Sequence, residues 1–154
     1  MHNAVKQISI SGNRQLLVVE TSTLSIADKT AARDLLEFLS IVMLDCPLSG
    51  TGAQAVLKNL TVCASGPQAA IRQLTPVFDG FAKNCFDLGP FGKGMKMKLM
   101  ANLLVAVHNV ATVEVVLLSQ WWGIAPSQAV RVLSDGARGS RMMQIRGPLM
   151  ENQG

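Results

Sequence analysis

Residues 89–120 have the sequence GPFGKGMKMKLMANLLVAVHNVATVEVVLLSQ, a glycine-containing segment that leads into a long apolar run. At about 100° per residue, Lys98, Asn102 and Asn109 fall within about 40° of one another and share one face of a helix. The rest of that helix is almost entirely apolar. A lysine on such a face is a candidate proton donor and acceptor, because partial loss of water favours its neutral amine.

The composition predicts a folded chain that is rich in core material and poor in surface charge. Its 154 residues suit one ordinary domain, with 49% hydrophobic and 16% charged residues. This balance excludes disorder and predicts that some apolar surface faces a partner. The net charge of +4 comes from scattered basic residues, aromatic residues are few and tyrosine is absent. We therefore expect no nucleic-acid partner.

The cysteines and the first residues predict a cytoplasmic protein. Cys46, Cys63 and Cys85 are far apart and form no CxxC pair, which indicates reduced core residues. The opening sequence MHNAVKQISISG has neither the apolar core nor the cleavage site of a signal peptide. Residues 99–122 are long enough to cross a bilayer, but Glu114 would be costly in mid-span. We therefore expect a helix that is buried in a soluble protein or in an oligomer, and no membrane.

Apolar runs and helical periodicity predict an α/β layout up to residue 89, followed by helices alone. The expected strands are 15–20, 41–44, 60–64 and 84–88. The expected helices between them are 26–40, with Ser25 as N-cap, and 68–81, with Pro67 in the first turn. The later helices are 94–122, 125–134 with Ser127 as its cap, and 140–150. We place a domain boundary between 1–89 and 90–154.

Small polar residues follow three of the expected strands, at the edge where open α/β sheets bind ligands. These segments are Thr21-Ser22-Thr23, the turn from Asp45 to Gly50, and Ser65-Gly66. Their hydroxyl and N–H groups are either anion donors or ordinary turn residues. Asp45 is either a catalytic acid or a turn former. His2 and His108 stand apart from any paired cysteines, so we expect no metal site.

The spacing Gly92-x-Gly94-x-x-x-Lys98-x-x-x-Asn102 is the pattern that favours a catalytic site. The glycines allow close backbone approach just before a helix begins. The lysine follows about one turn into the helix, and the asparagine lies one turn further on the same face. The alternative is a surface lysine near a helix start with an asparagine beside it.

Three sequence blocks resemble the β-hydroxyacid dehydrogenase family, which includes 3-hydroxyisobutyrate, tartronate semialdehyde and L-threonate dehydrogenases. Residues 18–23, VVETST, resemble the V-D-x-S-T segment that passes near the nicotinamide. Residues 44–50, LDCPLSG, are similar to the L-D-A-P-V-S-G-G substrate loop. Residues 92–102 match the G-x-G-x-x-x-K-x-x-x-N signature. Together with smaller similarities, the resemblance covers roughly residues 15–150.

The resemblance implies an oxidoreductase that moves hydride between a small 3-hydroxy acid and NAD or NADP. It implies that Lys98 is the general acid/base and that Asn102 orients the substrate. Ser49 and Gly50 would hold the substrate carboxylate, and Thr23 would lie against the cofactor. The implied fold is the C-terminal half of a Rossmann-type domain, then the long helix and first helices of a 6-phosphogluconate dehydrogenase-like helical domain. The long helix packs between subunits in the family, which implies a homo-oligomer through residues 94–122.

The chain also departs from the family pattern. The family begins with a βαβ unit that carries G-x-G-x-x-G, and this motif does not occur in the 154 residues. Glu20 replaces an aspartate, and Thr51 stands where the loop usually has a second glycine. Two hypotheses follow. The chain is an NAD(P)-dependent 3-hydroxyacid dehydrogenase or the catalytic piece of one. Alternatively, it is a non-catalytic truncated remnant, acting at most as a helix-mediated oligomerising or small-acid-binding module.

Overall fold

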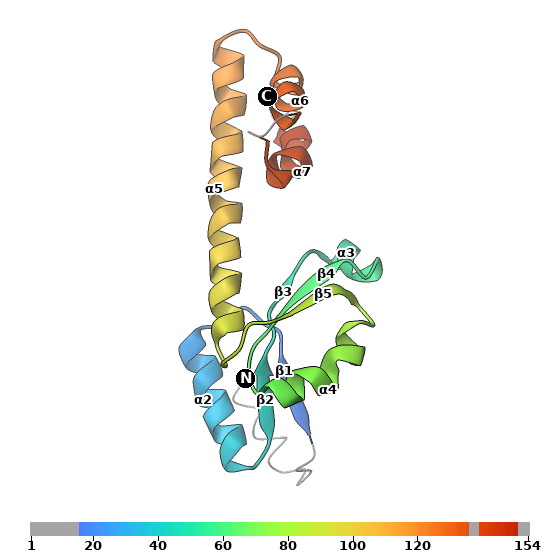
Figure 1. Cartoon of the computed structure of the whole chain (residues 1–154). Coiled ribbons are helices and arrows are strands. Elements are labelled where there is room, and N and C mark those ends of the chain that lie inside the picture. The colour runs from blue at the N-terminus through green and yellow to red at the C-terminus, as the bar shows by residue number, and fades with distance from the viewer. Residues whose placement is uncertain (1–15, 136–138, 151–154) are drawn as a thin grey trace. The chain divides into compact units, whose positions relative to one another are not determined.

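The computed structural model describes residues 16–135 and 139–150 (Figure 1). The chain divides into two compact units, residues 1–99 and 100–154. The elements of the first unit are β1 (Leu17–Glu20), α2 (Ile26–Phe38), β2 (Val42–Asp45), β3 (Leu48–Ser49), α3 (Gly52–Val56), β4 (Leu60–Ala64), α4 (Gln68–Phe78) and β5 (Ala82–Asp87). Helix α5 (Lys93–Trp121) begins in this unit and continues into the second, which also holds α6 (Pro126–Ser134) and α7 (Arg141–Met150).

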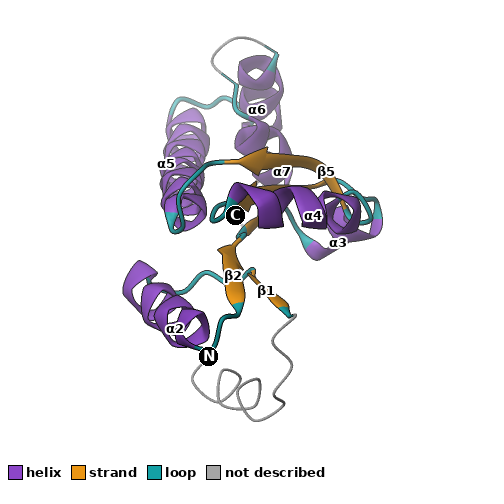
Figure 2. Cartoon of the chain, turned by 60° about the horizontal axis from the view of Figure 1, so that its bottom comes forward, coloured by secondary structure: helices purple, strands orange, loops and turns teal. Residues whose placement is uncertain are grey.

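The strands of the first unit form two small sheets that meet end to end (Figure 2). β1 pairs in parallel with β2, so Glu20 lies opposite Asp45 at their carboxyl ends. β4 pairs in parallel with β5 and antiparallel with β3. Backbone hydrogen bonds of 3.0 and 2.8 Å between Asp45 and Ser65 join β2 to the end of β4. The carboxyl ends of β1, β2 and β4 are thereby brought to one place.

Alternate residues of β2 pack into two different hydrophobic cores, one on each face of the strand. Met43 packs with Ala32 and Leu36 of α2, whereas Leu44 packs in the cluster that contains Val62 and Phe78. Successive side chains of a strand point to opposite faces, so one short strand serves both cores. A strand covered on both faces is typical of α/β folds.

The α/β layout followed by helices is confirmed, and every strand and helix expected from the sequence is present within a few residues of its expected bounds. The short elements β3 and α3 were not predicted. β3 has only two residues, too few to show an alternating pattern. α3 carries a local signal, a capping box in which Thr51 and Gln54 bond each other's backbone N–H groups.

In the second unit, the predicted N-cap of α6 is wrong. α6 begins with Pro126 after an N-cap, Ala125, that makes no side-chain hydrogen bond, so Ser127 lies inside the helix and does not cap it. Proline suits the first helical position because it has no N–H that needs an acceptor. α6 and α7 pack so closely that a Cβ at Gly147 would lie 2.6 Å from a methyl carbon of Val130.

Helix α5 is largely exposed in the single chain, whereas the sequence predicts a helix that is buried in the protein or in an oligomer. In the second unit it buries Thr112, Val116 and Ser119, which share one stripe. Among the described helices, α5 is long and apolar enough to cross a membrane, and 11% of its most apolar window is buried. Such a helix is weak evidence for a membrane protein, since core helices of other proteins have the same composition. The apolar residues outside the stripe are therefore open to a partner.

Candidate active site

The start of α5 is held by residues that are far away in sequence. The backbone N–H of Lys93 reaches the carbonyl oxygen of Pro90 at 3.2 Å, but the next two N–H groups have no such local acceptor. The Gly94 N–H donates to Oγ of Ser65 at 2.9 Å. The Met95 N–H donates to Oδ2 of Asp45 at 2.8 Å. Side chains at the carboxyl ends of β2 and β4 thus cap the helix, and the ends of both strands determine where it begins.

Each of the two glycines of the signature is required for a different structural reason. Gly92 has φ +87°, a conformation that L side chains rarely adopt. Gly94 is packed against backbone, because a Cβ there would collide with the carbonyl oxygen of Cys63 and lie 2.7 Å from that of Asp45. Only glycine lets the helix come this close to the strand ends.

Lys98 lies one turn after this capped start, as the signature spacing requires. Its side chain is partly buried, and its Nζ donates to the backbone carbonyl oxygen of Leu48 at 2.7 Å. Ser49 and Gly50 directly follow Leu48. Gly50 has φ +135°, and a Cβ there would lie 2.5 Å from Leu60 Cδ2. The structure therefore brings the predicted lysine to the predicted substrate loop, although the two are fifty residues apart.

The other two predicted site residues, Thr23 and Asn102, are both exposed. Thr23 is exposed in the segment that follows β1. In this segment the Ser22 N–H donates to Oε1 of Glu20 at 2.9 Å. Asn102 is exposed on α5 and belongs to the second unit. Of the polar strand-end residues, Asp45 and Ser65 are fully buried, so they serve the start of α5 and do not present donors to a ligand.

A buried ion cluster next to the site was not predicted. Lys29 in α2 is fully buried, and its Nζ lies 2.7 Å from Oδ1 of Asp45 and 2.6 Å from Oε2 of Glu20. The sequence does contain a signal for it. Lys29, Ala32 and Leu36 share the buried face of α2, and a charge on such a face requires a buried partner.

The charges of this cluster shift the pKa of Glu20. Burial alone raises the pKa of a carboxyl group, but hydrogen bonds from Lys29 and Ser22 and the Lys29 charge lower it. The net result is a pKa of Glu20 below its usual value, so this carboxylate stays charged at neutral pH. It thereby helps to balance the buried ammonium group.

The three cysteines are free thiols, as predicted. Burial raises the pKa of the Cys46 thiol from 9.0 to about 12. Burial also raises the pKa of Cys63 and Cys85, although the Lys98 charge near Cys63 opposes the effect there. None of the three is therefore an activated nucleophile. Within the described residues, no three His, Cys, Asp or Glu side chains gather where they could hold a metal.

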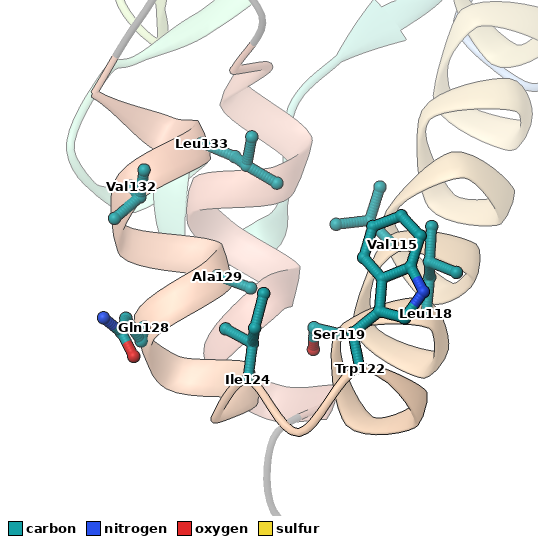
Figure 3. Close-up of a pocket in the computed structure, with 9 residues that line it drawn as sticks. All are labelled: Val115, Leu118, Ser119, Trp122, Ile124, Gln128, Ala129, Val132 and Leu133. Atoms are coloured by element: carbon teal, nitrogen blue, oxygen red, sulfur yellow. The ribbon is translucent and has the colours of Figure 1, made fainter.

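The second unit has a pocket of about 460 Å³ between the end of α5 and α6 (Figure 3). Its lining residues are Val115, Leu118, Ser119, Trp122, Ile124, Gln128, Ala129, Val132 and Leu133. Ser119 donates its hydroxyl to the carbonyl oxygen of Val116 in its own helix. No lining residue is titratable, so the pocket offers an apolar surface but no acid/base group.

Two family models match the chain. The NAD binding domain of 6-phosphogluconate dehydrogenase matches residues 2–89. The NAD-binding domain of NADP-dependent 3-hydroxyisobutyrate dehydrogenase matches residues 92–153. The chain belongs to the β-hydroxyacid dehydrogenase family. Both model descriptions name NAD binding, so the cofactor of the family is NAD or NADP.

Three similar proteins are 28–33% identical to the chain. L-threonate dehydrogenase of Haemophilus influenzae is 33% identical, over 84% of this chain and 43% of the relative. NAD-dependent L-serine dehydrogenase of Pseudomonas aeruginosa is 28% identical, over 88% of this chain and 47% of the relative. The crystal structure of 3-hydroxyisobutyrate dehydrogenase from Salmonella typhimurium has a TM-score of 0.79 at 33% identity. The match covers 88% of this chain and 48% of that structure's chain. The chain thus spans less than half of the length of these relatives.

The described residues can be compared with the general layout of a dinucleotide site. In open α/β sheets, ligands bind outside the carboxyl ends of parallel strands. The exposed segment of Thr23 follows the carboxyl end of β1. Lys98 lies beside the loop of Ser49 and Gly50, and Ser49 is opposite Thr61 near the amino end of β4. Glycines for the pyrophosphate, in the G-x-G-x-x-G arrangement, do not occur in the 154 residues.

Proposed function

We propose that the protein acts in NAD(P)-dependent oxidation or reduction of small 3-hydroxy acids, with Lys98 as the general acid/base. The observation that carries this proposal is the 2.7 Å hydrogen bond from Nζ of Lys98 to the carbonyl oxygen of Leu48. It holds the lysine beside Ser49 and Gly50, a hydroxyl and an N–H that suit a carboxylate. Family membership supports the reaction type.

In this proposal the bound nicotinamide supplies the hydride acceptor or donor. Lys98 uses one of its protons to hold the carbonyl of Leu48, which leaves its other positions for the substrate hydroxyl. In the oxidation direction, neutral Lys98 accepts the hydroxyl proton, and in reduction the ammonium returns it. Ser49 and Gly50 bind the carboxylate. Asn102, one helical turn after Lys98, contacts the substrate, and Thr23 contacts the cofactor.

The alternative function, a helix-mediated oligomerising or small-acid-binding module without catalysis, is favoured by one observation. Many apolar residues of α5 are exposed, with Leu103 and Val110 each more than 60% accessible. Exposed apolar area of this kind is typical of an interface. We propose a homo-oligomer formed through residues 94–122, in the cytoplasm and without nucleic acid or membrane, under either function. We also propose that a domain boundary separates 1–89 from 90–154.

The decisive experiment compares Lys98→Ala with Lys96→Ala in the 154-residue chain. Lys96 is exposed on the same helix and is therefore a matched control. We expect NADH and NADPH titrations, followed by nucleotide fluorescence, to give equal affinities in both variants and in the unaltered chain. With a panel of 3-hydroxy acids, Lys98→Ala should lower kcat by about 100-fold or more, the usual contribution of a general acid/base. Lys96→Ala should leave kcat unchanged.

Two results would reject the enzymatic proposal for this chain. Equal turnover in Lys98→Ala and Lys96→Ala would remove the role assigned to Lys98. Absence of any fluorescence change or thermal shift at saturating NADH and NADPH would favour the non-catalytic module. In that case, a thermal shift with 3-hydroxy acids alone, lost in Ser49→Ala, would identify a small-acid-binding site.

A further inference from the structure

The Asp45 carboxylate is a buried group that the proposed chemistry leaves without a function. Its Oδ1 accepts a hydrogen bond from Lys29 Nζ at 2.7 Å. Its Oδ2 accepts the Met95 N–H at 2.8 Å and lies 3.1 Å from Oγ of Ser65. Lys29, Asp45 and Ser65 are all fully buried. Both oxygens are thus occupied within the protein, which makes Asp45 a structural link.

This link replaces a local helix cap. The residue before α5 is Gly92, which has no side chain with which to cap the helix. A carboxylate close to the first N–H groups of a helix is stabilised by their partial positive charge. A buried carboxylate also needs a full counter-charge, which Lys29 supplies. Without Lys29, Asp45 would face the helix with part of its charge unbalanced.

Lys29 also reaches the segment proposed to contact the cofactor. Its Nζ lies 2.6 Å from Oε2 of Glu20, whose side chain is 12% exposed. Glu20 directly precedes Thr21, and its other oxygen accepts hydrogen bonds from the backbone N–H and the hydroxyl of Ser22. One ammonium group therefore joins the end of β1, the end of β2 and, through Asp45, the start of α5.

We propose that Lys29 is a positioning residue: by holding the Asp45 carboxylate it fixes the first turn of α5 and so places Nζ of Lys98 against the Leu48 carbonyl. The role as a positioning residue for catalysis rests on the proposed function. The effect on the placement of Lys98 does not. Met95 and Lys98 are one helical turn apart, so a small tilt of that turn moves the amine away from the substrate loop. A misplacement of about 1 Å lowers catalytic rates by about a hundredfold.

The first readout is the reactivity of Lys98, which requires no catalysis. The 154-residue chain is acetylated with limiting N-hydroxysuccinimide acetate, and peptide mass spectrometry gives the labelling ratio of Lys98 to the exposed Lys96. We expect Lys29→Met, which removes the charge and keeps a long chain, to raise this ratio several-fold. The double variant Lys29→Met with Asp45→Asn should return it towards the original value. It removes the unbalanced charge and keeps an oxygen acceptor for the Met95 N–H.

A control must show that a general loss of stability does not also raise the labelling ratio of Lys98 to Lys96. Phe78→Leu creates a cavity in a core cluster of the first unit that includes none of the ion-cluster residues, and it serves as a control for lowered stability. Its labelling ratio should equal that of the unaltered chain. If Lys29→Met fails to fold, Asp45→Asn alone is the second variant, since its amide is isosteric but has one acceptor oxygen and cannot accept from both Lys29 and Met95. It should raise the ratio as well.

The second readout is kinetic. If the proposed function holds, Lys29→Met should lower kcat by about ten- to a hundredfold while KM changes less than about threefold, because the lysine is misplaced but the carboxylate site remains. An unchanged labelling ratio in both Lys29→Met and Asp45→Asn would overturn the inference, whatever the kinetics show. A raised ratio in a chain without turnover would reject the proposed function and leave the placement of Lys98 by Lys29 supported.

Discussion

The Asp45 carboxylate accepts the backbone N–H of Met95 at 2.8 Å across fifty residues of sequence. This bond ties the carboxyl end of β2 to the first turn of α5, three residues before Lys98. Ser65 makes the parallel contact, because its Oγ accepts the Gly94 N–H at 2.9 Å. The position of the candidate catalytic lysine thus depends on close packing between a helix start and two strand ends.

The first prediction concerns Gly94 at this contact. Gly94→Ala places a Cβ against the carbonyl oxygens of Cys63 and Asp45, which are backbone atoms and cannot move aside easily. We expect the free energy of unfolding to fall by at least about 1–3 kcal/mol, the usual cost of overpacking. Urea unfolding followed by far-ultraviolet circular dichroism measures it.

Gly52→Ala is the matched control for this prediction. Gly52 begins α3, and a Cβ there would meet nothing within 4 Å. Alanine is the better helix former, so this variant should be neutral or slightly more stable. Equal stabilities of the two variants would show that the close approach at Gly94 is not required.

The second prediction separates a true helix cap from a false one. Ser25 caps α2, since its Oγ accepts the Asp28 N–H at 3.1 Å, whereas Ser127 is an exposed residue inside α6. Ser25→Ala should lower the free energy of unfolding by about 1 kcal/mol. Ser127→Ala should not lower it, because alanine is favoured within a helix. Thermal unfolding of both variants under one buffer condition provides the comparison. A loss of stability in Ser127→Ala would contradict the prediction.

Local patterns were sufficient for most of the fold. Ser25 followed by helical periodicity predicted α2, and the apolar run of residues 60–64 predicted β4 with its observed bounds. Each of these signals lies within a few consecutive residues, where propensity and periodicity act. The cap of α6 was placed wrongly because Pro126 and Ser127 are both favourable near a helix start, and sequence alone does not decide which comes first.

The candidate site was predicted where the sequence carries a spacing and missed where it depends on tertiary packing. The spacing from Gly94 to Lys98 identified the lysine, and the structure places it beside the Leu48 loop. The Lys29–Asp45 pair is sixteen residues apart and forms only because β1 and β2 pair with Glu20 opposite Asp45. The role of Asp45 as a cap for α5 likewise requires the folded sheet, so its residue type alone suggested a turn former or an acid.

The third prediction is a pH dependence due to Cys46. Burial raises the pKa of this thiol from 9.0 to about 12, so the unfolded chain loses the proton at lower pH than the folded chain. The free energy of unfolding should therefore fall as pH rises from about 9 towards 12, and this contribution should be constant below pH 9. Urea unfolding at a series of pH values should show a shallower decline for Cys46→Ala.

Cys85→Ala provides the comparison for Cys46→Ala. Cys85 is only half-buried, and desolvation is the main cause of the raised pKa of both thiols. Its removal should flatten the alkaline decline less than the removal of Cys46. Parallel declines in the unaltered chain and Cys46→Ala would refute the assignment to this buried thiol.

The last prediction concerns the exposed face of α5. Leu103, Val110 and Leu117 recur every seven residues and are 64%, 63% and 54% exposed, so they form one apolar stripe distinct from the buried stripe of Thr112 and Val116. A stripe with this repeat is suited to pack against a second helix. We therefore expect the chain to sediment as a dimer or larger oligomer.

The charge-bearing variant Val110→Glu with Leu117→Glu tests this stripe. It should shift the chain to the monomer in analytical ultracentrifugation, because two buried carboxylates per helix would lack partners. Phe38→Ser is the control, since Phe38 is 89% exposed on α2, outside the stripe, and its loss should leave the oligomer intact. A monomer that co-sediments with lipid vesicles, and loses that property in the double variant, would instead assign the stripe to a membrane, in accord with the length and hydropathy of α5.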